Sequence, residues 1–160
     1  KFQREYCTGD NTDFKALIPT KIDYVSKKNL RIEYPSLMKG LREYAKNSLR
    51  KPNTQYAIIQ YSEGTYYGRV DQENKRHGKG TFVFNDKSYY KGLWSQDVPY
   101  CCDCFRENDT KMYRGFFDSN GKRGGQGSKG KTYFLNGDTH EGFYLKGEYD
   151  DVFTYFWKGE

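Results

Sequence analysis

Residues 66–90 read YYGRVDQENKRHGKGTFVFNDKSYY, and this stretch decides the fold. An aromatic residue, a spacer and a glycine (Tyr66 to Gly68) precede a basic, glycine-rich turn over residues 75–80. The alternating run Thr81–Phe84 and an Asn-Asp turn follow. Alternation with period two, bounded by Gly and Asn/Asp turns, is typical of short β-strands joined as a hairpin.

The same pattern returns three times along the chain. Tyr90, Tyr113 and His140 each restart it with a glycine two residues later, so that successive starts are 24, 23 and 27 residues apart. The turn pairs Lys75-Arg76 and Lys122-Arg123 both begin nine residues after the leading Tyr. A period near two dozen residues is too short for a helical pair and indicates stacked β-hairpins. A half-repeat over residues 54–65 is expected to begin the sheet.

The stretch KRHGKGT at residues 75–81, together with the recurring Tyr-x-Gly, resembles the MORN repeat (membrane occupation and recognition nexus). The resemblance implies a mostly β fold, an elongated and twisted antiparallel sheet of stacked hairpins. It also implies that one sheet face binds a peptide or helix of a partner protein. Members of this family serve in cytoskeletal assemblies, including ciliary axonemes, and have been proposed to touch anionic phospholipid.

Every second side chain of a strand points to the same face, so the leading aromatics and glycines share one face. We expect an aromatic groove that binds a partner, lined by Tyr66, Val70, Tyr90, Trp94, Tyr113, Phe117 and Tyr144. The glycines expected to shape it are Gly68, Gly78, Gly80, Gly92, Gly115, Gly125, Gly127 and Gly142. The alternative is that the glycines only let aromatic rings of neighbouring hairpins cross closely.

Basic residues gather at the turns, and the chain carries a net charge of +6. They predict a basic rim along one edge of the sheet, with anionic lipid as a possible ligand: Lys75, Arg76, Lys79, Lys122, Arg123 and Lys129. The alternative is that they are solvated turn residues that protect an edge from aggregation. The hairpins that begin at Tyr90 and His140 lack the basic turn, which favours this second interpretation.

We divide the chain into an N-terminal extension, residues 1–53, and a repeat domain, residues 54–160. Within the extension, alternation predicts a hairpin over residues 21–34. Ser36 is an expected N-cap for an amphipathic helix over residues 36–49. Because solenoids need atypical end units, this helix is expected to cap the first edge of the sheet. A membrane-surface or mitochondrial-type helix is the weaker alternative, since its apolar face is short and lacks Trp and Phe.

Catalytic and metal-binding motifs are lacking in the sequence. Residues 78–81, GKGT, resemble the end of a phosphate-binding loop but lack its first glycine and its following helix. Cys101, Cys102 and Cys104 are too crowded to ligate one zinc ion together, and a fourth ligand is distant. His77 and His140 have no nucleophile motif around them. We therefore expect no enzyme activity, no cofactor, no metal and no nucleic-acid partner.

The sequence thus predicts a non-enzymatic scaffold that binds a protein partner within a large cytoskeletal or ciliary assembly. Crowded cysteines argue against a secreted disulfide framework, so an intracellular, cytoplasmic location is expected. Two alternatives stay open. One is a peripheral membrane adaptor that binds an anionic membrane surface through its basic turns. The other is a permanent accessory subunit of a large organellar complex, for instance mitochondrial, anchored by residues 1–53.

Overall fold

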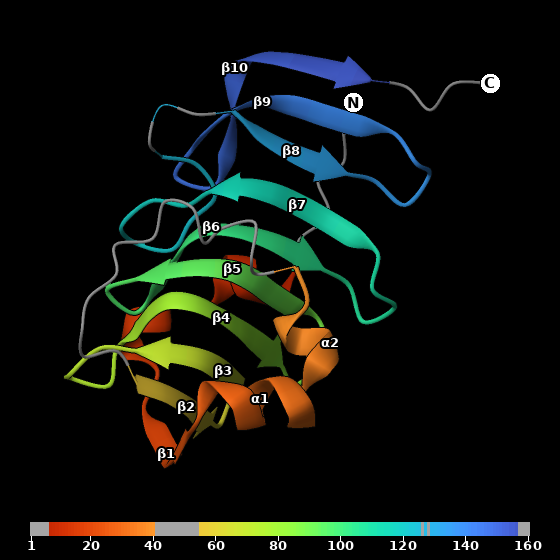
Figure 1. Cartoon of the computed structure of the whole chain (residues 1–160). Coiled ribbons are helices and arrows are strands. Elements are labelled where there is room, and N and C mark those ends of the chain that lie inside the picture. Colours follow the sequence, from red (N-terminus) through yellow and green to blue (C-terminus); the bar gives the residue numbers. More distant parts are fainter. Residues whose placement is uncertain (1–6, 41–54, 126, 128, 157–160) are drawn as a thin grey trace.

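The structure, a computed structural model, describes residues 7–40, 55–125, 127 and 129–156, with the backbone alone for 149–156. In this part of the chain, ten strands form one open antiparallel sheet in which every strand pairs with its neighbours in sequence (Figure 1). The strands are β1 Pro19–Val25, β2 Gln55–Tyr61, β3 Gly64–Val70, β4 Arg76–Phe84, β5 Tyr89–Ser95, β6 Val98–Phe105, β7 Lys111–Phe116, β8 Gly130–Tyr133, β9 Thr139–Leu145 and β10 Glu148–Phe156.

The predicted class is confirmed: the fold is mostly β, an elongated twisted sheet of successive hairpins (Figure 1). The leading residue of each predicted unit lies in a strand that runs in the same direction, namely β3, β5, β7 and β9. Asx turns close the hairpins at corresponding places. Ser88 N donates to Asp86 Oδ1, Thr110 N to Asn108 Oδ1 and Asp138 N to Asn136 Oδ1.

The N-terminal extension contributes to the sheet rather than standing apart from it. Strand β1 pairs with β2, so the sheet begins within residues 1–53 and its first edge is covered by a strand. The prediction that a helix caps this edge is therefore wrong. Pairing with a strand satisfies the N–H and C=O groups of β2 directly, which a helix side chain cannot do as completely.

The predicted hairpin over residues 21–34 is wrong in its second half. Residues Lys27–Glu33 form helix α1, and Pro35–Met38 form the single turn α2. Ser26 Oγ accepts from Asn29 N at 3.1 Å and caps α1, while Leu30 is fully buried and Tyr34 stacks near Tyr67 at 4.7 Å. The spacing of four between Leu30 and Tyr34 fits a helix and overrides the local alternation. Residues 41–49 of the predicted helix lie outside the described residues.

The sheet presents two different faces. One, here called the aromatic face, carries the side chains of Tyr66, Phe82, Tyr90 and Tyr113 together with a row of glycines. On the other, called the lysine face, α1 and α2 cover the β3–β5 end: Thr81 Oγ1 donates to Leu37 O and Lys91 Nζ to Ser36 O. Short 3-10 helices, Thr8–Asn11 and Phe14–Ala16, lie against the aromatic face and are seen behind the sheet in Figure 1.

Candidate functional site

The candidate site is the aromatic face together with the N-terminal segment that covers it, residues 7–17. All seven residues predicted to line a groove lie on this face or at its margin and belong to one cluster: Tyr66, Val70, Tyr90, Trp94, Tyr113, Phe117 and Tyr144. Each has at most 5% of its surface exposed. They are brought together as predicted, but they do not line an open groove, because the segment fills the space.

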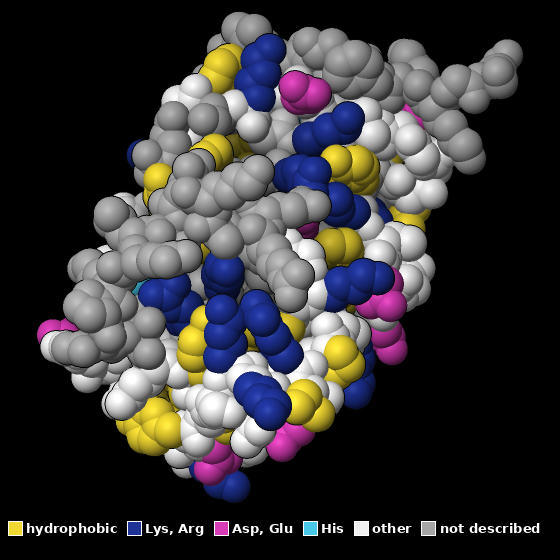
Figure 2. Space-filling model, in the orientation of Figure 1, with side chains coloured by type: hydrophobic (Ala, Val, Ile, Leu, Met, Phe, Trp, Pro, Cys, Tyr) yellow, Lys and Arg dark blue, Asp and Glu magenta, His cyan; other side chains and the backbone are white. Residues whose placement is uncertain are grey.

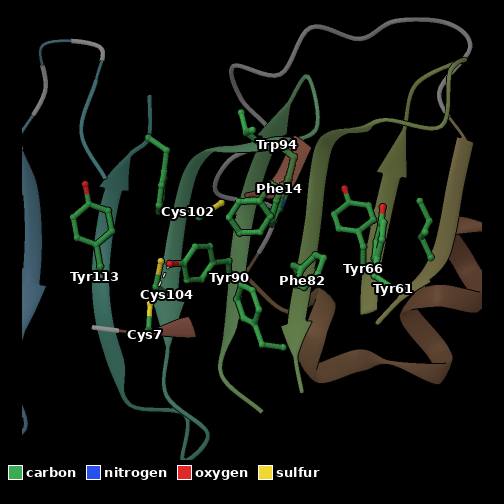
Figure 3. Packing of buried hydrophobic residues seen from close by; sticks show 14 of the residues in the cluster. Cys7, Phe14, Tyr61, Tyr66, Phe82, Tyr90, Trp94, Cys102, Cys104 and Tyr113 are labelled. Carbon is green, nitrogen blue, oxygen red and sulfur yellow. Dashed lines mark hydrogen bonds between the residues drawn. The ribbon is translucent and has the colours of Figure 1, made fainter. Parts of the chain in front are cut away.

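Phe14 is the centre of this arrangement. Its ring is fully buried among four others, here called the Phe14 cage: Phe82, Phe84, Tyr90 and Trp94. The centroid distances are 5.4 Å to Trp94 and 5.7 Å to Phe82, both edge-on (Figure 3). Edge-to-face contacts at this range add about 0.5–1.5 kcal/mol each beyond the burial of apolar surface. The cage therefore selects a flat aromatic side chain.

The glycine row explains why rings can lie flat on this face. Gly68, Gly80, Gly92 and Gly115 align across the strands, with Cys102 between the last two, and Gly130 pairs with Gly142 further along. A Cβ at Gly80 would stand 2.2 Å from Tyr66 Oη, and one at Gly115 would stand 2.5 Å from Tyr113 Oη. The slots are thus filled by the chain's own tyrosines, as the close-crossing interpretation predicts. Of the remaining glycines of the predicted set, Gly78 lies in β4 opposite Trp94, and Gly125 and Gly127 lie in the loop between β7 and β8; all three have a positive φ.

The predicted basic rim is wrong, because its two arginines are buried. Arg76 and Arg123 each have 1% of their side-chain surface exposed. Arg76 Nη2 donates to the carbonyl oxygen of Phe14 at 2.5 Å, and Arg76 Nε lies 3.2 Å from Asp97 Oδ1. A buried guanidinium needs a carboxylate and oriented carbonyls around it, and the fold supplies both.

Arg123 holds the other end of the N-terminal segment. Its Nε lies 3.0 Å from Asp10 Oδ1, and Lys122 Nζ donates to the carbonyl oxygen of Asp10 at 2.7 Å. Burial by itself lowers the pKa of Arg123, but the Asp10 carboxylate raises it, and the net pKa lies above its ordinary value. The Arg123 guanidinium is therefore a permanent cation aimed at a carboxylate four residues before Phe14.

The other residues of the predicted rim are scattered. Lys75 pairs with Glu73 at 2.9 Å in its own turn. Lys79 lies in β4 on the lysine face, and Lys129 Nζ lies 5.9 Å from the ring of Phe143 on that same face. The six basic residues therefore point in different directions and form no continuous strip.

Further contacts fix the register of the segment. Gly9 lies against the ring of Tyr90, where a Cβ would stand 2.2 Å from its Cζ. Cys7 Sγ lies 3.1 Å from Tyr90 Oη, and Thr8 Oγ1 donates to Asp86 Oδ2. Burial raises the pKa of the Cys7 thiol, with a smaller contribution from Asp10. This keeps it a neutral, packed group rather than a reactive thiolate.

Sequence reasoning missed the residues of the segment, above all Asp10 and Phe14, because the first 20 residues carry no periodicity. It also missed Asp97, the carboxylate partner of Arg76. The nine-residue spacing that relates the two basic turns was a usable signal: the equivalent positions of Arg76 and Arg123 imply a shared internal role. Arg76 and Arg123 were expected to be exposed because they are charged. That expectation fails because Asp97 and Asp10 lie close enough to pair with the buried guanidinium groups.

The crowded cysteines are packing residues. Cys102 and Cys104 are fully buried on the aromatic face, where burial raises the pKa of both thiols well above the ordinary value. Among the described residues, no group of three or more His, Cys, Asp or Glu side chains is placed to hold a metal ion. None of the described helices has the length and apolar character needed to cross a membrane.

A comparison with models of known protein families finds no match, and a comparison with curated proteins finds none either. The interpretation of this chain therefore depends on its own geometry.

Proposed function

We propose that this protein is a non-enzymatic scaffold that binds a protein partner through its aromatic face, as the likeness to MORN repeats suggests. One observation carries the proposal: this face already holds a peptide segment by side-chain recognition. Residues 7–17 form no strand of the sheet, and the face contacts them through the Phe14 cage and through Arg76 and Arg123.

This mode of attachment allows exchange. A segment paired as a strand could not leave without breaking ladder hydrogen bonds, whereas residues 7–17 can detach and leave every strand pair intact. Detachment exposes the Phe14 ring and separates Asp10 from Arg123, which together cost about 5–8 kcal/mol. It also breaks the hydrogen bonds that Arg76 and Lys122 donate to the carbonyl oxygens of Phe14 and Asp10. A partner segment of similar chemistry can repay this cost by taking the same place.

The contacts define what such a partner segment carries. It has an aromatic residue for the cage, a carboxylate four positions earlier for Arg123, and a small residue just before the carboxylate, where Gly9 lies against Tyr90. In this interpretation residues 7–17 are the ligand supplied by the chain itself. A cytoskeletal or ciliary assembly is the setting that the family resemblance suggests for such a scaffold.

The test vacates the face while the full chain is kept. The variant Asp10→Ala/Phe14→Ala removes both side chains that hold the segment, and Lys15→Ala, at an exposed neighbouring position, is the matched control. A labelled peptide with the sequence of residues 7–17 is titrated into each protein and followed by fluorescence anisotropy. We expect binding with a Kd on the order of 10 µM to the double variant and at least tenfold weaker binding to the Lys15→Ala control.

A peptide in which Phe is replaced by Ala should not bind the double variant. If the double variant keeps its far-ultraviolet dichroism and still fails to bind the unchanged peptide, residues 7–17 are a permanent part of the core and the proposal is rejected. Where binding is found, capture from native lysate with the double variant and the control identifies proteins that depend on the vacated face. Replacing Trp94 or Phe117 is a poorer test, because both are core residues and their loss would unfold the sheet.

A further inference from the structure

The lysine face beyond α2 takes no part in the proposed function, and its composition is unusual. It is formed by alternate side chains of β5 to β9, opposite to those of the aromatic face. Besides Leu93 and Cys101 it carries aromatic and charged side chains. The aromatic ones are Tyr89, Phe105, Tyr133 and Phe143, and the charged ones are Lys91, Asp103, Lys111, Arg114, Lys129, Lys131 and Glu141.

Ammonium groups on this face lie over aromatic rings. Lys111 Nζ is 5.7 Å from the ring centroid of Phe105 and 5.6 Å from that of Tyr133. Lys131 Nζ is 5.6 Å from the same Tyr133 ring, and Lys91 Nζ is 5.9 Å from Phe105. Lysine ammonium groups thus already contact these rings, and a stacking ligand such as a nucleic-acid base would compete with them.

Positive charge is in excess over this region. Five cations, Lys91, Lys111, Arg114, Lys129 and Lys131, face two carboxylates, Asp103 and Glu141. Asp103 is shared by two of these cations: Arg114 donates to it through two hydrogen bonds of 2.6 and 3.0 Å, and Lys111 Nζ lies 3.9 Å from its Oδ2. Figure 2 shows the same face, with Lys and Arg side chains in a band down its middle and acidic side chains mainly at the margins. The complementary surface is therefore acidic.

An exposed apolar side chain also lies on this face. Leu145 is 66% exposed and follows Phe143 on the same side of β9. Polyanions such as a nucleic-acid backbone gain nothing from an exposed leucine, whereas a protein helix that carries both carboxylates and leucines does. The combination of an ammonium row and an apolar margin thus favours a protein ligand.

We infer that the lysine face is a docking site for an acidic amphipathic helix of a protein partner, lying across the strands. Neighbouring strands are about 4.8 Å apart, close to the advance of about 4.5–6 Å between residues three or four apart on a helix. Carboxylates at that spacing can meet the cations of β5, β7 and β8, whereas β6 and β9 contribute Asp103 and Glu141 to this face. The chain's own residues 41–54 are an unsuitable occupant in charge, because they contain four basic residues and only Glu43 as an acidic one.

The test uses the full chain and defined probes. The first probe is a labelled synthetic helix of about 18 residues, long enough to cross five strands, with Glu and Leu at helical spacing. The others are a scrambled isomer of the same composition, an oligo(dT) strand, and vesicles that contain phosphatidylserine. Binding is measured by anisotropy, or by co-sedimentation for vesicles, at about 0.15 M salt, where long-range charge effects are screened.

We expect the helix to bind at least about fivefold more tightly than its scrambled isomer and than oligo(dT) or vesicles. The reversal Lys129→Glu/Lys131→Glu should weaken helix binding about tenfold. Its matched control, Lys15→Glu/Lys87→Glu, makes the same charge change at exposed positions off this face and should change binding less than about twofold. Leu145→Ala should weaken the helix alone.

Equal binding of helix and scrambled isomer would show unspecific charge attraction and overturn the inference. So would tighter binding of oligo(dT) or vesicles with the same dependence on Lys129 and Lys131, or no binding of any probe. Vacating the aromatic face with Asp10→Ala/Phe14→Ala should leave helix binding unchanged. The proposal for the lysine face and the proposal for the aromatic face can therefore be rejected independently of each other.

Discussion

Two buried arginines, Arg76 and Arg123, occupy equivalent places 47 residues apart, yet they find their carboxylates in different parts of the chain. The surroundings are alike: Tyr66 Oη donates to Arg69 O at 2.8 Å, and Tyr113 Oη to Phe116 O at 3.0 Å. Around Arg76 the carboxylate is Asp97, from the next turn of the sheet. Around Arg123 it is Asp10, from the N-terminal segment.

The cause is one position in the two turns. Asp97 N donates to Arg76 O at 3.1 Å, and Gly147 N donates to Arg123 O at 3.0 Å, so Asp97 and Gly147 are equivalent. Because Gly147 has no side chain, Arg123 has no carboxylate at the position equivalent to Asp97. Arg123 pairs instead with Asp10 of the N-terminal segment. The ion pair of Arg76 is therefore made with a residue of the repeat sheet's own turn, and the ion pair of Arg123 is made with the N-terminal segment. The two equivalent arginines thus differ in the origin of their carboxylate, which is a turn of the sheet for Arg76 and the N-terminal segment for Arg123.

The largest expected effect separates the two arginines. Arg76→Ala removes the guanidinium partner of the Asp97 carboxylate and of the carbonyl oxygens of Asp97 and Phe14, and it should lower the free energy of unfolding by about 3–5 kcal/mol. Arg123→Ala should cost only about 1–2 kcal/mol, because the segment can detach and return Asp10 to water. Urea denaturation followed by Trp fluorescence measures both values. Equal losses would mean that the segment cannot leave separately from the sheet.

The next effect concerns the fit of the segment to Tyr90. A Cβ at Gly9 would stand 2.2 Å from Tyr90 Cζ, and this ring is itself buried, so it has little room to move. Gly9→Ala should weaken docking by about 1–3 kcal/mol, the usual cost of overpacking. Amide hydrogen exchange is the measurement: protection should fall over residues 7–17 and persist in β3 to β6. Lys15→Ala, at an exposed position of the same segment, is the control.

A smaller effect should follow from making the two units alike. Gly147 has φ of +86°, and Asp97 adopts a φ of +71° at the equivalent position, so Asp is tolerated in this geometry. Gly147→Asp would offer Arg123 a carboxylate from its own sheet and should weaken docking of the segment by about 1 kcal/mol. Gly147→Asn is the matched control without charge. If hydrogen exchange of residues 7–17 is the same in both variants, the new carboxylate does not compete with Asp10 for Arg123. The ion pair between Asp10 and Arg123 would then not be what holds the segment on the face.

The sequence was sufficient for the sheet because its signals are local and repeated. Alternation around Phe82 and the turns at Asp86 and Asn136 fix hairpins without help from distant residues. The aromatic cluster was predicted for the same reason, since residues two apart share a face. What occupies that cluster could not be predicted. Phe14 reaches its cage across more than 60 residues of chain, and no pattern around Phe14 indicates that contact.

The smallest effect uses His140, a titratable residue at the position where the three earlier units begin with Tyr66, Tyr90 and Tyr113. Burial lowers the pKa of His140 below its ordinary value of 6.5. The unfolded chain therefore binds more protons than the folded one just below pH 6.5, so the stabilisation present above that pH is lost as the pH falls towards the folded pKa. Stability should thus decline on mild acidification in the wild type, and the decline should be shallower in His140→Phe. Urea midpoints between pH 7.5 and about 5 measure the difference between the two proteins. The ring of His140 lies near that of Tyr144 in β9, with centroids 6.1 Å apart, and His140 pairs with Thr132 of β8, whereas the unit of Arg76 begins with Tyr66. Hydrogen exchange near pH 5 should therefore show that β8 and β9 open before β3 and β4. Simultaneous opening of both units would show that the sheet responds as a whole, and the two units would then differ in their ligand but not in their stability.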